Sequence, residues 1–474
     1  MTTRSPIRVS DNRHYLQHAD GRPFFYLADT AWLLFNKLTI EEADELFADR
    51  AAKGFTAIQA CVFRDLFEPN TPNVAGVRPF ATDEDLHAVR LNPAWLEHVV
   101  RVVRRAQEHN LVIGLLPTWG DKWNEHSNSA GPVIMEGDSA RRYCRDLSDG
   151  LAGCENVVWI LGGDSPLQTQ AYADTVRAMA EGLRAGGSRE RLITFHPGGQ
   201  ESSAVFHAEP WLDLNAIQSS HFRLNFPNYV HVERLFAARP PKPCMDAESN
   251  YEGISVFATA WRGLQRKGDT VFSAYDVRKA YYRSVLAGAA GHSYGAEPIR
   301  QLLRPGDTIH GAREGDVAFW REGLKLPGSS QLALLQRELF SRSYFTRVPA
   351  QELLRPYRQM VAWPDPMNVG LPFAGQTNLD PAARISVAKC SEGSWAMAYM
   401  PIRQELYLDV RPLAGERFRL SVFDPETGEL QDRREFDPPR VDPRPRLTPM
   451  HYEDGVLLYI PKRDTDTFFT IDAL

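Results

Sequence analysis

Short apolar runs alternate with amphipathic segments over most of this chain, which predicts strands and helices in turn. Eight runs have the length and composition of buried strands: residues 23–29, 55–63, 111–119, 156–164, 191–197, 214–222, 242–248 and 291–297. Helical patterns occur at residues 39–53, 93–109, 138–151, 168–186, 228–238, 274–288 and 331–342. The strands are too apolar for a sheet with one wet face, so the pattern predicts a parallel sheet covered on both sides by helices.

Eight parallel strands are the number that closes a (β/α)8 barrel, and a span of about 320 residues suits such a barrel with enlarged loops. A doubly wound open sheet is the alternative. It has less support because no glycine-rich phosphate loop follows the first strand, where the chain reads ADTAWLL.

The pattern changes beyond about residue 355, where proline becomes frequent and helical periodicity ends. Three runs with strand character lie there: residues 394–402, 417–430 and 455–463. The segment FDPETGEL predicts a hairpin that turns near Thr427 and Gly428. We therefore expect an α/β fold with a (β/α)8 TIM barrel at residues 1–355, which includes a short N-terminal β extension, and a small antiparallel β-sandwich at 356–474.

The composition of the chain argues against several classes of function. Of 474 residues, 54 are Lys or Arg and 60 are Asp or Glu, a net charge of −6, which argues against nucleic acid as a partner. No apolar run approaches the roughly 18 residues of a membrane span, and no signal peptide is visible, so we expect a cytoplasmic protein. The five cysteines are widely spaced without a CxxC pair, which predicts neither a disulfide framework nor a metal site.

In a parallel barrel the carboxyl ends of the strands meet at one mouth, where catalysis takes place. Acidic, aromatic and imidazole side chains, with one arginine, stand at nearly all the predicted strand ends. They are Asp29, Trp32, Arg64, Trp119, Asp164, His196, His221, Glu248, Tyr251, Glu252 and Tyr294. Sugars offer apolar CH faces to aromatic rings and hydroxyls to carboxylates and imidazoles, so this set predicts a carbohydrate site.

Hydrolysis of a glycosidic bond needs two carboxyl groups, one protonated and one ionised. Asp164 follows two glycines at the end of the fourth strand, and DAESNYEG places several carboxylates at the end of the seventh. Each residue alone also has a structural interpretation. Asp164 before Ser-Pro is a good helix N-cap, and His196 or His221 in an apolar strand is often a core histidine.

The motifs WILGGD, TFHPGG, QSSHF, KPCMDAESNYEG and GHSYGAE, together with residues 23–65, resemble those of the apiosidase-like glycoside hydrolases, glycoside hydrolase family 140. The resemblance covers most of the chain in the same order. It extends to the small C-terminal collagen-binding-type β-domain that accompanies the family. It implies a clan A barrel and cleavage at apiose, a branched pentose of pectin, without a cofactor or metal.

Residue by residue, the resemblance implies that Asp164 is the general acid/base and Glu248 the nucleophile of a retaining mechanism. The other residues at the mouth would bind substrate. Retention would place the two carboxyl groups about 5–5.5 Å apart. Two departures concern the pattern of the wider clan. Gly-Asp stands where the clan has Asn-Glu, and YGAEPIRQ lacks the aromatic expected after its glycine, which leaves the identity of the sugar open.

Three alternatives compete with this interpretation. A metal-dependent barrel hydrolase would need a His-x-His pair on the first strand, which the chain lacks. A non-catalytic carbohydrate-binding barrel would keep the aromatic residues but not need both carboxylates. A retaining glycosidase for another sugar, such as an arabinofuranoside, has the same sequence features. Since we expect no export signal, imported oligosaccharides or plant glycosides are the expected substrates, and the sequence does not indicate an oligomeric state.

Overall fold

The computed structural model describes residues 6–63, 70–126, 131–256, 270–307, 318–355, 381–438, 455–462 and 464–474. Eight parallel strands form a nearly closed ring in its N-terminal part. They are β4 (Tyr26–Thr30), β5 (Ala57–Cys61), β6 (Val112–Leu116), β7 (Val157–Gly162), β8 (Ile193–His196), β9 (Asn215–Gln218), β10 (Cys244–Glu248) and β12 (Gly291–Ala296). The hydrogen-bonded order is β8-β7-β6-β5-β4-β12-β10-β9, and a short strand β11 (Tyr251–Glu252) pairs with β12. The predicted barrel is therefore confirmed.

The ring closes between β8 and β9 without a regular ladder. The backbone N–H of Asp213 donates to the Ile193 carbonyl at 2.9 Å, and Thr194 Oγ1 donates to the Leu214 carbonyl at 2.9 Å. These bonds join the two edge strands of the sheet, so all the strand ends surround one mouth.

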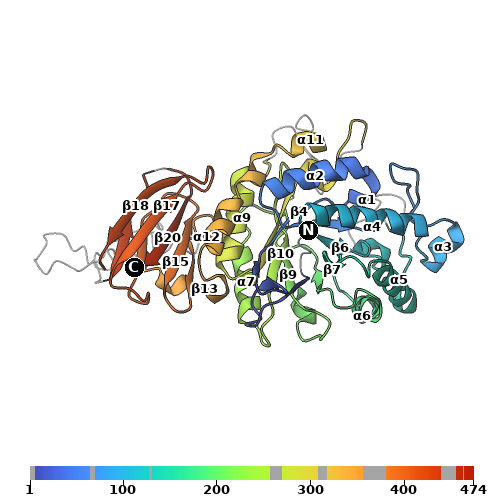
Figure 1. Cartoon of the computed structure of the whole chain (residues 1–474), viewed down its shortest axis with the longest axis horizontal. Helices are drawn as coiled ribbons and strands as arrows, with labels where there is room; N and C mark the ends of the chain where they lie inside the picture. The colour runs from blue at the N-terminus through green and yellow to red at the C-terminus, as the bar shows by residue number, and fades with distance from the viewer. Residues whose placement is uncertain are drawn as a thin grey trace, which may run out of the picture. The chain divides into compact units, whose positions relative to one another are not determined.

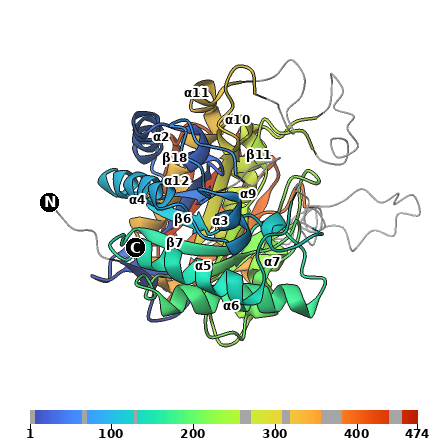
Figure 2. The same cartoon turned by 90° about the vertical axis from the view of Figure 1, so that its right-hand side faces the viewer.

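Helices follow most of the strands. They are α2 (Ile40–Ala52), α4 (Pro93–Glu108), α5 (Gly137–Gly150), α6 (Gln170–Ala185), α7 (Asn228–Ala237) and α9 (Ala274–Leu286). Figures 1 and 2 show α2, α4, α5 and α6 outside the strands β4, β6 and β7. The signals for these helices are local. Thr39 Oγ1 accepts from the Glu42 backbone N–H, and the Glu42 carboxylate accepts from the Thr39 backbone N–H, which is the capping box that the sequence predicts.

A three-stranded antiparallel sheet precedes the barrel, formed by β1 (Ile7–Val9), β2 (Leu16–His18) and β3 (Pro23–Phe24). This sheet is the expected N-terminal β extension. All five cysteines are buried, and none of them forms a disulfide bond. Among the described residues, no helix is both long and apolar enough to cross a membrane.

The C-terminal part is built on antiparallel sheets. One has the order β13-β14-β15-β20-β17-β18, and β16 pairs with β19 in a second. Their bounds are β13 (Arg347–Pro349), β14 (Ser386–Cys390), β15 (Trp395–Met400), β16 (Leu406–Asp409), β17 (Phe418–Phe423), β18 (Leu430–Phe436), β19 (Val456–Tyr459) and β20 (Thr467–Ala473). The predicted hairpin joins β17 to β18, and Gly428 takes a φ of 75° at its turn.

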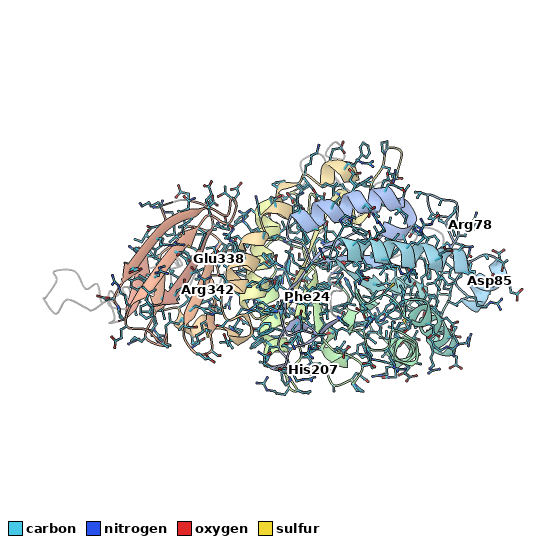
Figure 3. The ribbon with its side chains drawn as sticks, in the orientation of Figure 1. Phe24, Arg78, Asp85, His207, Glu338 and Arg342 are labelled. Carbon is cyan, nitrogen blue, oxygen red and sulfur yellow. The ribbon has the colours of Figure 1, made fainter. Side chains whose placement is uncertain are left out.

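The chain forms two compact units. The first comprises Met1–Leu224, Arg234–Val277 and Ala289–Ser330, and the second comprises Asn225–Glu233, Arg278–Gly288 and Gln331–Leu474. Within the second unit, Tyr282 stacks on Tyr399 with ring centroids 4.4 Å apart, and Arg278 forms a bidentate ion pair with Asp466. Arg342 follows the end of α12 (Ala333–Phe340) and forms an ion pair at 2.9 Å with Glu338 of that helix (Figure 3). Part of the chain between β10 and β12 thus belongs to the C-terminal unit.

Candidate active site

The turn after β7 carries Asp164 on a strained stretch of backbone. Gly162, Gly163 and Asp164 all have positive φ, at 98°, 101° and 55°. A Cβ on Gly162 would lie 2.2 Å from the His196 carbonyl oxygen, and one on Gly163 would lie 2.8 Å from the backbone nitrogen of Gly120. Glycine is therefore required at both positions, by conformation and by space. Left-handed strain in a non-glycine residue such as Asp164 is typical of functional sites.

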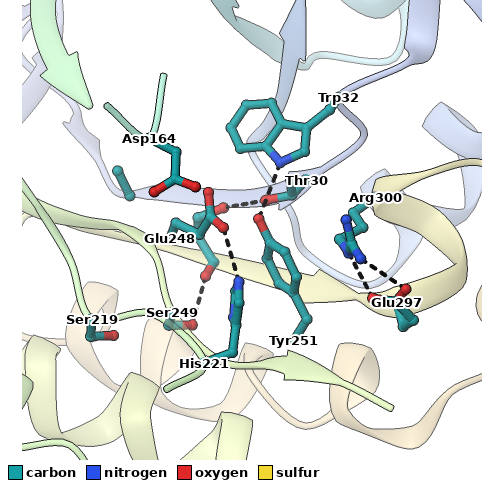
Figure 4. Close-up of polar contacts among 12 residues, drawn as sticks. Thr30, Trp32, Asp164, Ser219, His221, Glu248, Ser249, Tyr251, Glu297 and Arg300 are labelled. Atoms are coloured by element: carbon teal, nitrogen blue, oxygen red, sulfur yellow. Dashed lines mark hydrogen bonds and ion pairs between the residues drawn. The ribbon is translucent and has the colours of Figure 1, made fainter. Parts of the chain in front are cut away.

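Glu248 stands at the end of β10, across the mouth from β7. In the ladder with β9 it pairs with Gln218, and a bulge separates it from Asp246. Bulges change the direction of the side chains that follow. Asp246 is fully buried and accepts a bond from Ser219 Oγ at 2.8 Å, whereas the carboxyl groups of Glu248 and Asp164 point toward one another (Figure 4).

Two histidines hold the carboxylate of Glu248. His221 Nε2 lies 3.0 Å from Oε1, and His196 Nε2 lies 3.1 Å from Oε2. The first contact is a well-aligned hydrogen bond, while the second is an ion-pair contact with poorer alignment. Burial alone would raise the pKa of Glu248, but the bonds and charges of His196 and His221 outweigh it and hold that pKa below its ordinary value.

Asp164 has the opposite environment. Burial and the negative charge of Glu248 raise the pKa of Asp164 to about 6, against the opposing effects of His196 and of a hydrogen bond from the Gln218 side chain. Two facing carboxyl groups therefore differ in protonation below about pH 6. That is the combination of one acid and one carboxylate that glycosidic chemistry requires.

Aromatic rings enclose the two histidines. The rings of Trp32 and Trp119 are 4.9 Å apart, and they lie 5.7 Å and 5.9 Å from the ring of His196. The ring of Tyr251 lies 4.4 Å from that of His221, and its hydroxyl accepts a hydrogen bond from Trp32 Nε1 at 3.2 Å. Five of the expected substrate-binding residues are thus gathered around the carboxyl pair: Trp32, Trp119, His196, His221 and Tyr251.

The family model of the apiosidase-like catalytic domain matches residues 10–346, which is most of the chain. The chain belongs to the apiosidase-like family. It is a glycoside hydrolase. No curated protein has a matching sequence.

Solved structures agree with the apiosidase-like fold. A structure described as a glycoside hydrolase has a TM-score of 0.81 at 24% identity, over 99% of this chain and 97% of that one. A glycoside hydrolase family 5 protein from Bacteroides vulgatus ATCC 8482 has a TM-score of 0.80 at 23% identity, over 99% of this chain and 93% of that one. At these identities the likeness concerns the fold, and it extends through the C-terminal unit.

Three residues expected to bind substrate in this apiosidase-like site make their bonds elsewhere. The carboxylate of Asp29 is fully buried and pairs with Arg50 Nε of α2 at 2.5 Å. Glu252 accepts bonds from Tyr294 Oη at 2.7 Å and from the backbone N–H of Gly328 at 3.0 Å. These side chains hold helices and loops to the barrel, because strand ends in a closed ring also point at neighbouring elements. Arg64 lies outside the described residues.

Sequence reasoning missed two groups beside the pair. Gln218 is 2% exposed, is the ladder partner of Glu248 and bonds Asp164. Arg300 forms a bidentate ion pair with Glu297 and lies 5.8 Å from the Tyr251 ring, facing the site from beyond β12 (Figure 4). Both residues lie near strand ends in the motifs QSSHF and YGAEPIRQ, and this position was the signal that the sequence offered. Which side chains they contact depends on how the strands and loops are paired in the fold.

A resident metal has no obvious ligand set here. Within the described ranges, no three His, Cys, Asp or Glu side chains are grouped so that they could hold a metal ion. The imidazole nitrogens nearest the mouth face the Glu248 carboxylate instead.

Proposed function

We propose that this chain is a retaining glycosidase in which Glu248 is the nucleophile and Asp164 the general acid/base. Its substrate class is a terminal or side-chain pentose of the apiose type, on plant-derived oligosaccharides or glycosides. One observation carries the proposal. Two facing carboxyl groups at the ends of β7 and β10 have pKa values shifted in opposite directions, to about 6 for Asp164 and downward for Glu248.

In the first step a carboxylate oxygen of Glu248 attacks the anomeric carbon. The bond from that carbon to the glycosidic oxygen breaks, and the proton of Asp164 passes to the leaving oxygen. The products are a free alcohol and a glycosyl ester on Glu248, and Asp164 is left ionised. General acid catalysis of this kind contributes about 10²–10⁴-fold.

In the second step Asp164 takes a proton from water while the water oxygen bonds to the anomeric carbon and displaces Glu248. Both residues return to their starting protonation states, and the sugar leaves with its original anomeric configuration. Trp32, Trp119 and Tyr251 pack around the two histidines that contact Glu248 and so help to position it. The apiose-type substrate rests on the family, and other pentoses are tested beside it.

The experiment compares aryl glycosides of apiose and of arabinofuranose, and apiose-containing oligosaccharides, with the first-formed anomer followed by NMR. We expect hydrolysis of the apiosides with retention. Inversion would contradict the assignment of Glu248 as nucleophile. Preference for the arabinofuranoside would change the proposed substrate but leave the proposed mechanism intact. Binding without any released sugar would support a non-catalytic carbohydrate-binding protein.

Substitutions separate the two roles. Glu248→Gln should abolish turnover on every substrate, because no carboxylate is left to form the ester. Asp164→Ala should lose about 10²–10⁴-fold on poor leaving groups and far less on activated aryl groups, which leave without a proton. Glu252→Gln is the control, since its carboxylate bonds Tyr294 and an amide can still accept that bond. Full activity of Glu248→Gln would reject the mechanism.

A further inference from the structure

We infer that His196 is a positively charged positioning residue, an imidazolium that keeps Glu248 ionised and oriented. The inference deepens the proposed function, since it concerns the electrostatics of the same site. It begins with the surroundings of the two ring nitrogens.

Both nitrogens of His196 face oxygen acceptors. Nε2 lies 3.1 Å from Glu248 Oε2, and Nδ1 lies 3.1 Å from the carbonyl oxygen of Pro197. A neutral imidazole carries one proton and donates once, whereas an imidazolium donates from both nitrogens. The backbone N–H of Asp164 also approaches Nδ1, but at 3.4 Å, the weak end of hydrogen bonding. The shorter contacts therefore favour the doubly protonated ring.

The pocket of His196 suits a cation. The ring is fully buried, and the ring centroids of Trp32 and Trp119 lie 5.7 Å and 5.9 Å from it, a distance at which an aromatic ring can interact with a cation. Burial alone would lower the pKa of His196, but the charges of Glu248 and Asp164 outweigh it and raise that pKa above its ordinary 6.5.

His221 contacts Glu248 through a different oxygen and has a different aromatic neighbour. Its Nε2 bonds Glu248 Oε1 at 3.0 Å, and its ring lies along the ring of Tyr251. A single donor, Nε2–H, makes that bond. The charged groups that face His196 are thus Glu248 on β10 and Asp164 after β7. The positive charge of Arg300, which follows β12 in the chain, interacts electrostatically with Glu248 as well.

A charge on His196 has a consequence for both carboxyl groups. A positive charge beside a carboxyl group lowers its pKa, and His196 acts in this way on Asp164 and on Glu248. Loss of that charge should therefore raise both values and move the acid limb and the alkaline limb of the activity profile to higher pH together. A purely structural role would reduce activity without moving either limb.

The first test does not depend on catalysis. In the intact protein labelled with ¹⁵N-histidine, one imidazole should stay doubly protonated as the pH is raised past 6.5, and its signals should be missing from His196→Gln. The same ring should become neutral at lower pH in Glu248→Gln, which removes its counter-charge. If His196→Gln does not fold, the ring is assigned in the wild-type protein by its contacts with the Trp32 and Trp119 indoles. A His196 ring that is already neutral below pH 6.5 overturns the inference, even if the protein hydrolyses glycosides as proposed.

The second test compares the pH profiles of His196→Gln and His221→Gln on an activated aryl glycoside. Glutamine can still donate to Glu248 but carries no charge. We expect both limbs to move up by about one pH unit or more in His196→Gln and to move less in His221→Gln, because His196 has the larger effect on both carboxyl groups. Unmoved limbs in His196→Gln, or a shift confined to His221→Gln, would overturn the inference. If the wild-type protein cleaves no glycoside, the proposed function fails, while the NMR titration still decides the charge of His196.

Discussion

At the scale of single residues, the environment reverses the ordinary acidities of the two carboxyl groups. Aspartate is normally the stronger acid, with a pKa of 3.8 against 4.5 for glutamate. Here the pKa of Asp164 is raised to about 6 by burial and by the negative charge of Glu248, and the pKa of Glu248 is lowered because two imidazoles contact its carboxylate. The proposed roles therefore follow from the neighbours of each residue and not from its type.

This order of acidities predicts an acid-shifted activity profile. Asp164 must be protonated for the first step, so kcat/KM should fall as the pH rises through about 6. Glu248 must be ionised, and its lowered pKa keeps it so through the acidic range. The check is the pH dependence of kcat/KM on a substrate with a poor leaving group. The alkaline limb should vanish in Asp164→Ala, and a limb that persists there would belong to another group.

Away from the mouth, the buried pair of Arg50 and Asp29 should matter for stability. Both side chains are fully buried, and burial raises the pKa of Asp29 even beside Arg50, so the pair itself contributes little net stability. Arg50→Met, however, leaves the carboxylate of Asp29 without this partner. We expect a loss of about 3–5 kcal/mol in the free energy of unfolding, measured in urea at pH 7.

The loss of stability in Arg50→Met should depend on pH and should become smaller as the pH falls. In the variant the folded-state pKa of Asp29 lies further above its unfolded value, so the charged form is penalised at neutral pH and the penalty fades as the pH falls and Asp29 binds a proton. Arg22→Met is the matched control, because Arg22 forms an exposed pair with Asp20, and little change is expected. An equal loss in both variants would contradict this account.

At the scale of elements, the end of β7 depends on backbone that only glycine allows. Gly162→Ala would bring a methyl group to 2.2 Å from the His196 carbonyl at a positive φ, so the strand end must shift and move Asp164. We expect a fall in kcat of at least about 10²-fold, the usual effect of misplacing a catalytic group by about 1 Å. Gly153→Ala, where the nearest atom is 3.6 Å away, should stay active. Wild-type kcat in Gly162→Ala would show that the close approach is not needed.

The elements themselves were the most predictable part of the molecule. All eight predicted strands exist, with bounds a few residues shorter than expected, and every predicted helix is present. Strands buried on both faces are recognised from short apolar runs, and helices from their period and caps such as Thr39. The bulge in β10 and the strand β11 were not predicted, since both depend on a neighbouring strand and not on local sequence.

At the scale of the whole molecule, the expected division at residue 355 stays a prediction, and a truncation tests it. The second compact unit includes Arg278–Gly288, where Arg278 pairs with Asp466 and Tyr282 stacks on Tyr399. A chain that ends at residue 355 would lose both partners. We expect it to be poorly soluble or to unfold at a clearly lower temperature than the full chain in calorimetry.

Asp466→Asn in the full chain is the companion variant, because it weakens the ion pair and keeps the aromatic stack. It should lower the melting temperature less than truncation does. A truncated barrel as stable as the full chain would mean that residues 1–355 fold independently, as the sequence pattern alone suggests.

The sequence by itself determined the order of strands and helices, the number of strands that closes a barrel, and the family. These depend on local periodicity and on motifs that are contiguous along the chain. It also placed Asp164, Glu248, His196 and His221 at strand ends, which a parallel barrel brings to one mouth. Only the tertiary structure decided which of those ends face each other. Asp29, Glu252 and Tyr294 occupy equivalent positions but bond away from the carboxyl pair. The physical reason is that acidity and pairing depend on distances across the ring, between residues far apart in the chain, and no local pattern encodes them.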